Sequence, residues 1–274
     1  MKKFALIGQP LSHSLSPSIH AAAYHDLQLH GHYDLLETAT EQVEGVIELV
    51  RTGEIDGLNV TIPHKVTVMP FLDAIDEDAN AIGAVNTIKK VGNQVIGYNT
   101  DAQGFKESLL ERLHIKTVRQ QRILVIGAGG AARAIVHTLG KDGAVLTIVN
   151  RTISKAEELA GMYPFDVTHL TIEAAEMILN QFDIVINTTS VGMSSFTNKS
   201  PIKLDRLASS TLVCDLIYNP LETILLKEAK NRGNATLNGV GMLVNQAALA
   251  IEIWTGKKPN RKLMEETLVR EVRN

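Results

Sequence analysis

The sequence predicts an α/β protein of two αβ domains, the second built on a doubly wound parallel sheet. Apolar runs of strand length alternate with helical stretches along the whole chain, a pattern typical of α/β folds. The chain has 274 residues, enough for one or two domains with a sizeable core. A glycine-rich turn, GAGG at 127–130, joins an apolar run to a helix-forming stretch in the second part of the chain.

The first hundred residues predict one αβ unit without a glycine-rich turn. Its strands are expected at 4–8, 33–36 and 57–62, followed by a hairpin of 84–90 and 94–98 around Gly92-Asn93. Its helices are expected at 16–27, 41–50, 65–72 and 74–82. Ser16 is the expected N-cap of the first helix, because Pro17 then takes the first helical position.

The rest of the chain predicts a second unit and a return to the first. A helix is expected from 101 to 113, then strands at 123–126, 146–150, 183–187, 212–215 and 235–237. Further helices are expected after the glycine turn and at 154–162, 172–179, 242–254 and 261–272. The last two helices are expected to rejoin the first domain, which gives domains of 1–101 plus 240–274 and 102–239. A ligand is then expected in the cleft between the domains.

Composition excludes several classes of function. Apolar residues make up 45% of the chain, charged residues 21%, and the net charge is −3, so no basic surface argues for a nucleic-acid partner. No apolar run has membrane-span length, and no signal peptide is recognisable. We therefore expect a cytoplasmic protein without a membrane partner. The single cysteine, Cys214, lies in an apolar run and is expected to be buried.

The glycine turn has the layout of a dinucleotide-binding, Rossmann-type βαβ unit. Gly127 allows the tight turn after the strand, and Gly129 lets the backbone approach a pyrophosphate. The pyrophosphate would then lie at the positive end of the following helix. Ala132 occupies the third position of the fingerprint, where a small residue permits helix–strand packing. The alternative is an ordinary tight turn, but the strand before it and the helix after it favour nucleotide binding.

The end of the next strand indicates which dinucleotide is bound. Asn150, Arg151 and Thr152 stand there, with Lys155 just beyond. A carboxylate at this place would repel a 2′-phosphate, whereas a guanidinium can bind it with two parallel hydrogen bonds. The sequence therefore predicts NADP rather than NAD.

Two residues of the first unit are candidates for proton transfer. Lys65 follows a strand that Pro63 ends, so it is expected at the carboxyl edge of the sheet, where α/β proteins bind ligands. A lysine there can donate or accept a proton, although a solvated lysine at a helix start is the alternative. Asp101 ends another strand and is expected either to share the site with Lys65 or to be a helix N-cap.

Other polar residues are candidates for substrate binding or for structural roles. The hydroxyls of 12–18 precede a helix N-terminus, a position that suits a small carboxylate. Gln246 interrupts an apolar helix and is either a satisfied core residue or a cleft residue. No metal site is expected, because no histidine has metal-ligand spacing. His25, His30 and His32 are expected at the surface.

Taken together, eight segments in order along essentially the whole chain resemble the shikimate dehydrogenase family. They are SLS at 14–16, NVTIPHK at 59–65, GAVNT at 83–87, YNTD at 98–101, GAGGA at 127–131, NRT at 150–152, DLIYNP at 215–220 and GMLVNQ at 241–246. The resemblance implies reversible, NADP-dependent reduction of 3-dehydroshikimate to shikimate, a step towards chorismate and the aromatic amino acids.

The resemblance also implies a role for individual residues. It makes Lys65 and Asp101 the catalytic pair, with Lys65 exchanging the proton and Asp101 orienting it. The implied substrate residues are Ser14 and Ser16 at the carboxylate, and Thr61, Asn86, Asp101, Tyr218 and Gln246 around the ring. The implied cofactor residues are Glu77, Gly127, Ala128, Gly129, Gly130, Ala131, Asn150, Arg151, Thr152, Lys155, Leu216 and Gly239. For Glu77 the sequence itself gives no independent support.

Departures from the family pattern are small. Lys155 stands where many relatives carry arginine, which weakens the expected 2′-phosphate site at that corner, while Arg151 is retained. Serine at both 14 and 16 favours shikimate over quinate. Three alternatives stay open: a paralogue acting on quinate, a non-catalytic NADP-binding sensor, and a subdomain of a larger assembly. The sequence is compatible with a monomer or a homodimer.

Overall fold

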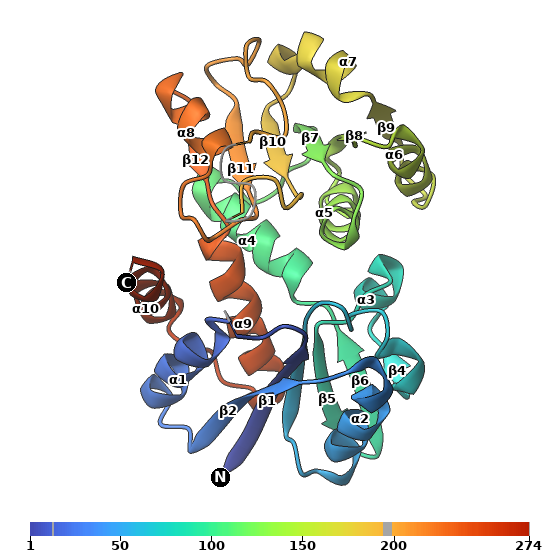
Figure 1. The fold of residues 1–274 in the computed structure, drawn as a ribbon, viewed down its shortest axis with the longest axis vertical. Helices are drawn as coiled ribbons and strands as arrows, with labels where there is room; N and C mark the ends of the chain where they lie inside the picture. The colour runs from blue at the N-terminus through green and yellow to red at the C-terminus, as the bar shows by residue number, and fades with distance from the viewer. Residues whose placement is uncertain (13, 194–198, 274) are drawn as a thin grey trace. The chain divides into compact units, whose positions relative to one another are not determined.

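The computed structural model describes residues 1–12, 14–193 and 199–273, which form two compact units (Figure 1). Unit 1 comprises Met1–Gly104 and Val244–Asn274, and unit 2 comprises Phe105–Leu243. The division falls inside helices α4 (Asp101–Leu113) and α9 (Val240–Thr255). The boundaries expected from the sequence lie at the first residues of the same two helices. The binding roles expected for the two domains remain predictions.

Unit 1 contains a six-stranded sheet in the order β2-β1-β3-β5-β6-β4. Its strands are β1 (Lys2–Gly8), β2 (Gly31–Glu37), β3 (Gly57–Val60), β4 (Ala74–Ile75), β5 (Thr87–Val91) and β6 (Gln94–Tyr98). β1 pairs in parallel with β2 and β3, while β5 is antiparallel to both β3 and β6. The predicted hairpin is therefore confirmed. Its geometry brings the carboxyl ends of β1, β3 and β6 and the start of β5 to one edge of the sheet.

The helices of unit 1 differ from expectation in one stretch. Besides parts of α4 and α9 they are α1 (Ser16–Asp26), η1 (Thr40–Gln42), α2 (Val43–Thr52), η2 (Met69–Phe71), α3 (Glu77–Ile82) and α10 (Arg261–Arg273). The helix expected at 65–72 is wrong: turns and the short 3₁₀ helix η2 occupy it. The Lys65 carbonyl accepts from the Val85 amide at 2.8 Å, which engages a carbonyl that a continuing helix would use. The helix expected at 74–82 is shorter, because its first two residues pair with β6 as β4.

Unit 2 contains a six-stranded sheet in the order β12-β11-β10-β7-β8-β9, in which every pairing is parallel. Its strands are β7 (Arg122–Ile126), β8 (Val145–Val149), β9 (Val167–Leu170), β10 (Ile184–Asn187), β11 (Leu212–Asp215) and β12 (Thr236–Leu237). Its helices, besides parts of α4 and α9, are α5 (Gly130–Lys141), α6 (Ile153–Ala160), α7 (Ile172–Met177), η3 (Leu179–Gln181) and α8 (Ile224–Asn231). The predicted doubly wound parallel sheet is confirmed.

Two elements of unit 2 were not expected. β9 is a four-residue edge strand with no buried residue, so it lacks the apolar run that marks its neighbours. α8 has only eight residues, three of them buried. Both elements are short, and their structure depends on packing against the sheet more than on a strong local pattern.

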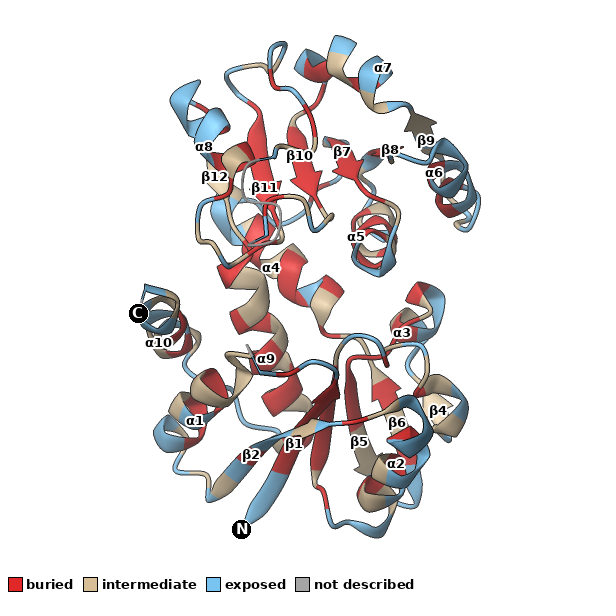
Figure 2. Ribbon diagram, in the orientation of Figure 1, coloured by how far each residue is buried: buried red, intermediate tan, exposed pale blue. Residues whose placement is uncertain are grey.

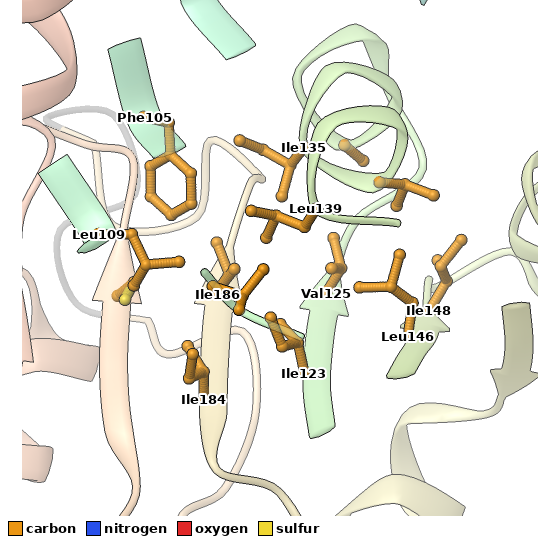
Figure 3. Packing of buried hydrophobic residues seen from close by; sticks show 14 of the residues in the cluster. Phe105, Leu109, Ile123, Val125, Ile135, Leu139, Leu146, Ile148, Ile184 and Ile186 are labelled. Carbon is orange, nitrogen blue, oxygen red and sulfur yellow. The ribbon is translucent and has the colours of Figure 1, made fainter. Parts of the chain in front are cut away.

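Buried side chains of the sheets form the core of each unit (Figure 2). Figure 3 shows part of the core of unit 2, where α4 and α5 cover the strands. The labelled residues are Phe105, Leu109, Ile123, Val125, Ile135, Leu139, Leu146, Ile148, Ile184 and Ile186. Cys214 is fully buried in the same cluster, as predicted, and burial raises the pKa of its thiol. Among the described residues, no helix combines the length and apolar character that crossing a bilayer requires.

Candidate active site

One edge of the unit 1 sheet gathers most of the predicted catalytic and substrate residues. Ser14 and Ser16 lie beyond the end of β1, and Thr61 and Lys65 follow β3. Residues 86 and 98–101 flank the β5–β6 hairpin at the same edge. Because the carboxyl ends of β1, β3 and β6 meet there, the topology alone places these segments together.

Lys65 is held by backbone contacts on both sides. The His64 amide donates to the Thr61 carbonyl at 2.9 Å and closes the turn after β3. The His64 ring is fully buried, and its Nε2 hydrogen-bonds the Thr38 carbonyl at 2.7 Å. The Lys65 carbonyl accepts from Val85. These contacts fix the turn that carries Lys65. The alternative, a solvated lysine at the start of a helix, is therefore wrong.

Asp101 begins α4 without capping it. The Asn99 side chain accepts from the backbone amides of Asp101 at 3.1 Å and Ala102 at 3.4 Å. Asparagine therefore satisfies the first helical donors, a typical N-terminal role. The N-cap alternative for Asp101 is wrong, because a residue two positions earlier already supplies the acceptor.

The carboxylate of Asp101 contacts the amine of Lys65. Lys65 Nζ donates to Asp101 Oδ2 at 2.6 Å. The side chains are 31% and 17% exposed, respectively, so both are partly shielded from water yet accessible to a small molecule. An ammonium and a carboxylate in this arrangement can exchange a proton with a bound hydroxyl.

A buried polar network lies beside this pair. Asn86 is 3% exposed; its Nδ2 donates to Thr100 Oγ1 at 3.0 Å, and its Oδ1 accepts from the Thr100 amide at 2.8 Å. Thr87 Oγ1 also donates to Asn86 Oδ1, and it accepts from Asn59 Nδ2 at 3.1 Å. Asn86 thus fixes the residue before Asp101, whereas its predicted substrate contact remains a prediction.

The serine pair opens α1. Leu15, not Ser16, occupies the N-cap position, so the predicted cap is wrong. The Ser16 amide instead donates to Ser14 Oγ at 3.3 Å. Burial raises the pKa of the nearby Tyr33 hydroxyl, and the Ser16 side chain lowers it. The Tyr33 hydroxyl donates to Asn59 Oδ1 at 2.8 Å, so Tyr33 belongs to the same buried network.

Three further predicted site residues lie in different surroundings. Thr61 and Gln246 belong to unit 1 and are half-buried, after β3 and on α9 respectively. Tyr218 belongs to unit 2, beyond β11, and burial raises the pKa of its hydroxyl. Their substrate contacts remain predictions.

In unit 2, a cavity of about 550 Å³ lies at the carboxyl edge of the sheet. The predicted residues that line it come from the glycine turn and from the segment after β8: Gly127, Ala128, Gly129, Asn150, Arg151, Thr152 and Lys155. The other lining residues were not predicted: Ile126, Ile172, Thr189, Ser190, Val191, Lys199, Ser200 and Pro201. The polar run TTS at 188–190 follows β10 and was a usable signal, since ligands bind where strands of such sheets end.

The glycine turn has the geometry expected of a pyrophosphate cradle. Gly127 has a φ of +116°, a region that side chains rarely adopt. A Cβ on Gly129 would meet no other atom within 4 Å, so the backbone there is open to a ligand. Gly129 is also the N-cap of α5 and provides no side-chain cap, which leaves the first helical N–H groups available to an anion.

The charges of this cavity fit NADP. Arg151, Lys155 and Lys199 line it, and no aspartate or glutamate does so among the described residues. Asn150 Nδ2 donates to the Thr152 carbonyl at 2.9 Å, which fixes the backbone that presents Arg151. A cationic cavity beside uncapped helix N–H groups suits a ligand with several phosphates.

Some predicted cofactor residues do not line the cavity. Gly130 and Ala131 form the start of α5 and are exposed. Glu77 is exposed in the first turn of α3, in unit 1. Leu216 and Gly239 are neighbours, because the Gly239 amide donates to Ile217 and a Cβ on Gly239 would lie 2.0 Å from the Leu216 carbonyl oxygen. Their contacts with a cofactor remain predictions.

Two loops at this edge are joined by a buried network that was not predicted. Asn187, at the end of β10, donates from Nδ2 to Asp215 Oδ1 at 3.1 Å, and its Oδ1 accepts from the Thr189 amide at 3.0 Å. Asp215, at the end of β11, accepts from the Ile217 amide at 3.1 Å and from Thr223 Oγ1 at 2.7 Å. Burial raises the pKa of Asp215 to about 6. The hydrogen bonds to its carboxylate lower the pKa, but their effect is smaller than that of burial.

Among the described residues, no group of three or more histidine, cysteine, aspartate or glutamate side chains could hold a metal ion. His25, His30 and His32 are exposed, as predicted.

Comparisons with known proteins cover nearly the whole chain. Residues 6–88 match the family described as "Shikimate dehydrogenase substrate binding domain". Residues 109–220 match "Shikimate / quinate 5-dehydrogenase", and residues 239–269 match "Shikimate 5'-dehydrogenase C-terminal domain".

Relatives of known name agree with these matches. A shikimate dehydrogenase (NADP(+)) of Shouchella clausii is 53% identical over 272 residues, which are 97% of this chain and 98% of the relative. A crystal structure of a shikimate dehydrogenase in complex with NADP+ has a TM-score of 0.93 and 41% identity, covering 99% of this chain and 96% of that one. The Thermus thermophilus enzyme in complex with NADP(H) and shikimate has a TM-score of 0.89 and 36% identity, covering 98% and 99%. The chain belongs to the shikimate dehydrogenase family.

Proposed function

We propose that this protein catalyses the reversible NADP-dependent reduction of 3-dehydroshikimate to shikimate, on the route to chorismate and the aromatic amino acids. The observation that carries the proposal is the 2.6 Å contact between the Lys65 amine and the Asp101 carboxylate. The cationic cavity of unit 2 and the names of relatives matching nearly the whole chain support it.

The pair supplies the proton that the reaction exchanges. When bound, NADP accepts or returns the hydride. In the oxidising direction the substrate hydroxyl must also lose a proton, which Lys65 takes up as a neutral amine. In the reducing direction the ammonium of Lys65 donates that proton to the developing alkoxide. Asp101 orients the amine through the contact at Oδ2 and, with its other oxygen, orients the hydroxyl.

The remaining residues of unit 1 position the substrate. Ser14 and Ser16 are proposed to bind the carboxylate, because their hydroxyls stand at the start of α1, where an anion is favoured. Thr61, Asn86 and Gln246, together with Tyr218 of unit 2, are proposed to contact the ring hydroxyls or complete the pocket. Asn86 also supports Asp101 through its bonds to Thr100, so its loss would affect both binding and turnover.

The cofactor is proposed to bind along the cavity of unit 2. The N–H groups at Gly129 and Gly130 would receive the pyrophosphate, and Arg151 and Lys155 the 2′-phosphate. Glu77, Ala131, Leu216 and Gly239 keep the cofactor roles predicted for them. We also propose a cytoplasmic location, no nucleic-acid or membrane partner, and a monomer or homodimer.

An assay of NADP reduction with shikimate, followed by near-ultraviolet absorbance, tests the proposal. Quinate replaces shikimate in a second reaction, and NAD replaces NADP in a third. We expect rapid turnover only with shikimate and NADP. Turnover with quinate or NAD would assign the protein to a paralogue. A folded protein that binds NADP and turns over no pair would overturn the catalytic proposal in favour of a sensor.

A further inference from the structure

The cavity of unit 2 has a cation that lies outside the segment after β8. Lys199 belongs to the connection between β10 and β11, whereas Arg151 and Lys155 both follow β8. Within the described part of the chain, none of these three side chains forms a hydrogen bond or an ion pair. No acidic residue among those described lines the cavity. Three uncompensated positive charges therefore border one cavity, and they come from two separate segments.

We propose that Lys199 is a specificity-determining residue that binds the 2′-phosphate of NADP together with Arg151 and Lys155. This inference rests on the proposed function and adds a residue to the recognition of its cofactor. Lys199 is exposed, so its contribution is electrostatic and decreases as salt is added.

The chemistry of the two phosphate groups favours this assignment over the pyrophosphate. A phosphate monoester carries a charge of about −1.5 to −2 at neutral pH, and a single guanidinium only partly balances it. Lys155 adds one point charge and no paired donors. Each phosphate of the pyrophosphate carries a smaller charge, and the uncapped N–H groups at the start of α5 would bind it. The monoester is therefore the group that gains most from another cation.

Lys199→Gln tests the proposal, because it removes the charge and keeps most of the side-chain length. Lys203→Gln is the matched control, since Lys203 is an exposed lysine of the same connection that does not line the cavity. Calorimetric titration with 2′,5′-ADP and with 5′-AMP isolates the 2′-phosphate, because the two nucleotides differ only in that group, and it requires no turnover. We expect Lys199→Gln to weaken 2′,5′-ADP binding about tenfold at low salt, with 5′-AMP binding unchanged. Lys203→Gln should change neither.

Equal losses for 2′,5′-ADP and 5′-AMP would place Lys199 at the 5′-phosphate and overturn the proposal, as would unchanged affinity for 2′,5′-ADP. Lys199→Arg keeps the charge, so it should retain tight binding; a loss as large as that of the glutamine variant would also contradict a charge-based role. The catalytic proposal can fail independently of the proposal for Lys199. A wild-type protein that binds 2′,5′-ADP but does not oxidise shikimate would overturn the catalytic proposal and leave the Lys199 result valid.

Discussion

The amine of Lys65 lies 2.6 Å from Oδ2 of Asp101 although the two residues are 36 positions apart in the sequence. The contact exists because β3 and β6 end at the same edge of one sheet and because Asn99 relieves Asp101 of capping α4. The catalytic role proposed for this pair predicts that the contact matters more for turnover than for the stability of unit 1.

Lys65→Met should therefore lower kcat by about 100- to 10,000-fold, the usual contribution of a positioned general acid or base. The KM for shikimate should change much less, because the serines and the ring contacts remain. Steady-state kinetics in both directions measure this. The ion pair is partly exposed and contributes little to folding, so an unchanged melting temperature is the control. A variant with near-normal kcat would contradict the role of Lys65.

Arg151→Ala should weaken NADP binding about 10- to 100-fold, since a charge-assisted contact with a phosphate is lost. NAD binding should not change, because NAD has no 2′-phosphate. The ratio of kcat/KM for the two cofactors reports the difference directly. Equal losses for NAD and NADP would refute the assignment of Arg151 to the 2′-phosphate.

Features that depend on local sequence were predictable. The glycine turn, the strand ends after β3 and β8, and the β5–β6 hairpin each combine an apolar run with a distinctive polar or glycine signal. These features were sufficient to predict a parallel sheet in unit 2 and a cationic strand end beside the turn. These local features predict which residues follow each strand. The order of the strands in the sheet then determines which of those residues lie next to one another.

Features that depend on distant contacts were not predictable. At the start of α1 the Ser14 hydroxyl, and at the start of α4 the Asn99 side chain, accept from backbone amides. The sequence offers Ser16 and Asp101 for the same role and does not say which side chain bonds the helix. The segment after Lys65 was expected to be helical, but the Lys65 carbonyl accepts from the amide of Val85, which is twenty residues away and precedes β5. Lys199 and the Asn187–Asp215 contact likewise depend on the connection from β10 to β11.

The two glycines of the turn should respond differently to alanine. Gly127→Ala places a side chain at a φ of +116° and a Cβ 2.5 Å from Thr188 Oγ1, so it should destabilise unit 2 by about 1–3 kcal/mol. Gly129→Ala meets no atom within 4 Å, so the fold should be unaffected. Its Cβ should instead obstruct the pyrophosphate and raise the KM for NADP at least about tenfold.

Thermal unfolding and cofactor titration separate these two effects. Gly127→Ala should lower the melting temperature, and Gly129→Ala should leave it unchanged while weakening NADP and NAD alike. If Gly129→Ala bound both cofactors normally, the pyrophosphate could not lie at this turn.

Asp215 should make the stability of unit 2 depend on pH in an unusual direction. Burial raises its pKa from 3.8 to about 6 in the folded protein, so the folded state holds this proton more tightly than the unfolded chain. The stabilisation from this group is complete below about pH 4 and is lost as the pH rises through about 6, by about 3 kcal/mol. Most carboxylates behave in the opposite way, because their pKa is lowered by folding.

Asp215→Asn removes the titration and largely preserves the side-chain shape. The free energy of unfolding of the wild type, measured in urea relative to this variant, should fall by about 2 kcal/mol between pH 4.5 and pH 7. Asp205→Asn is the control, because the Asp205 side chain is 77% exposed and should give no such slope. A pH-independent difference between wild type and Asp215→Asn would mean that the hydrogen bonds from Asn187, Ile217 and Thr223 outweigh burial. Asp215 would then be an ordinary anionic anchor for the two loops.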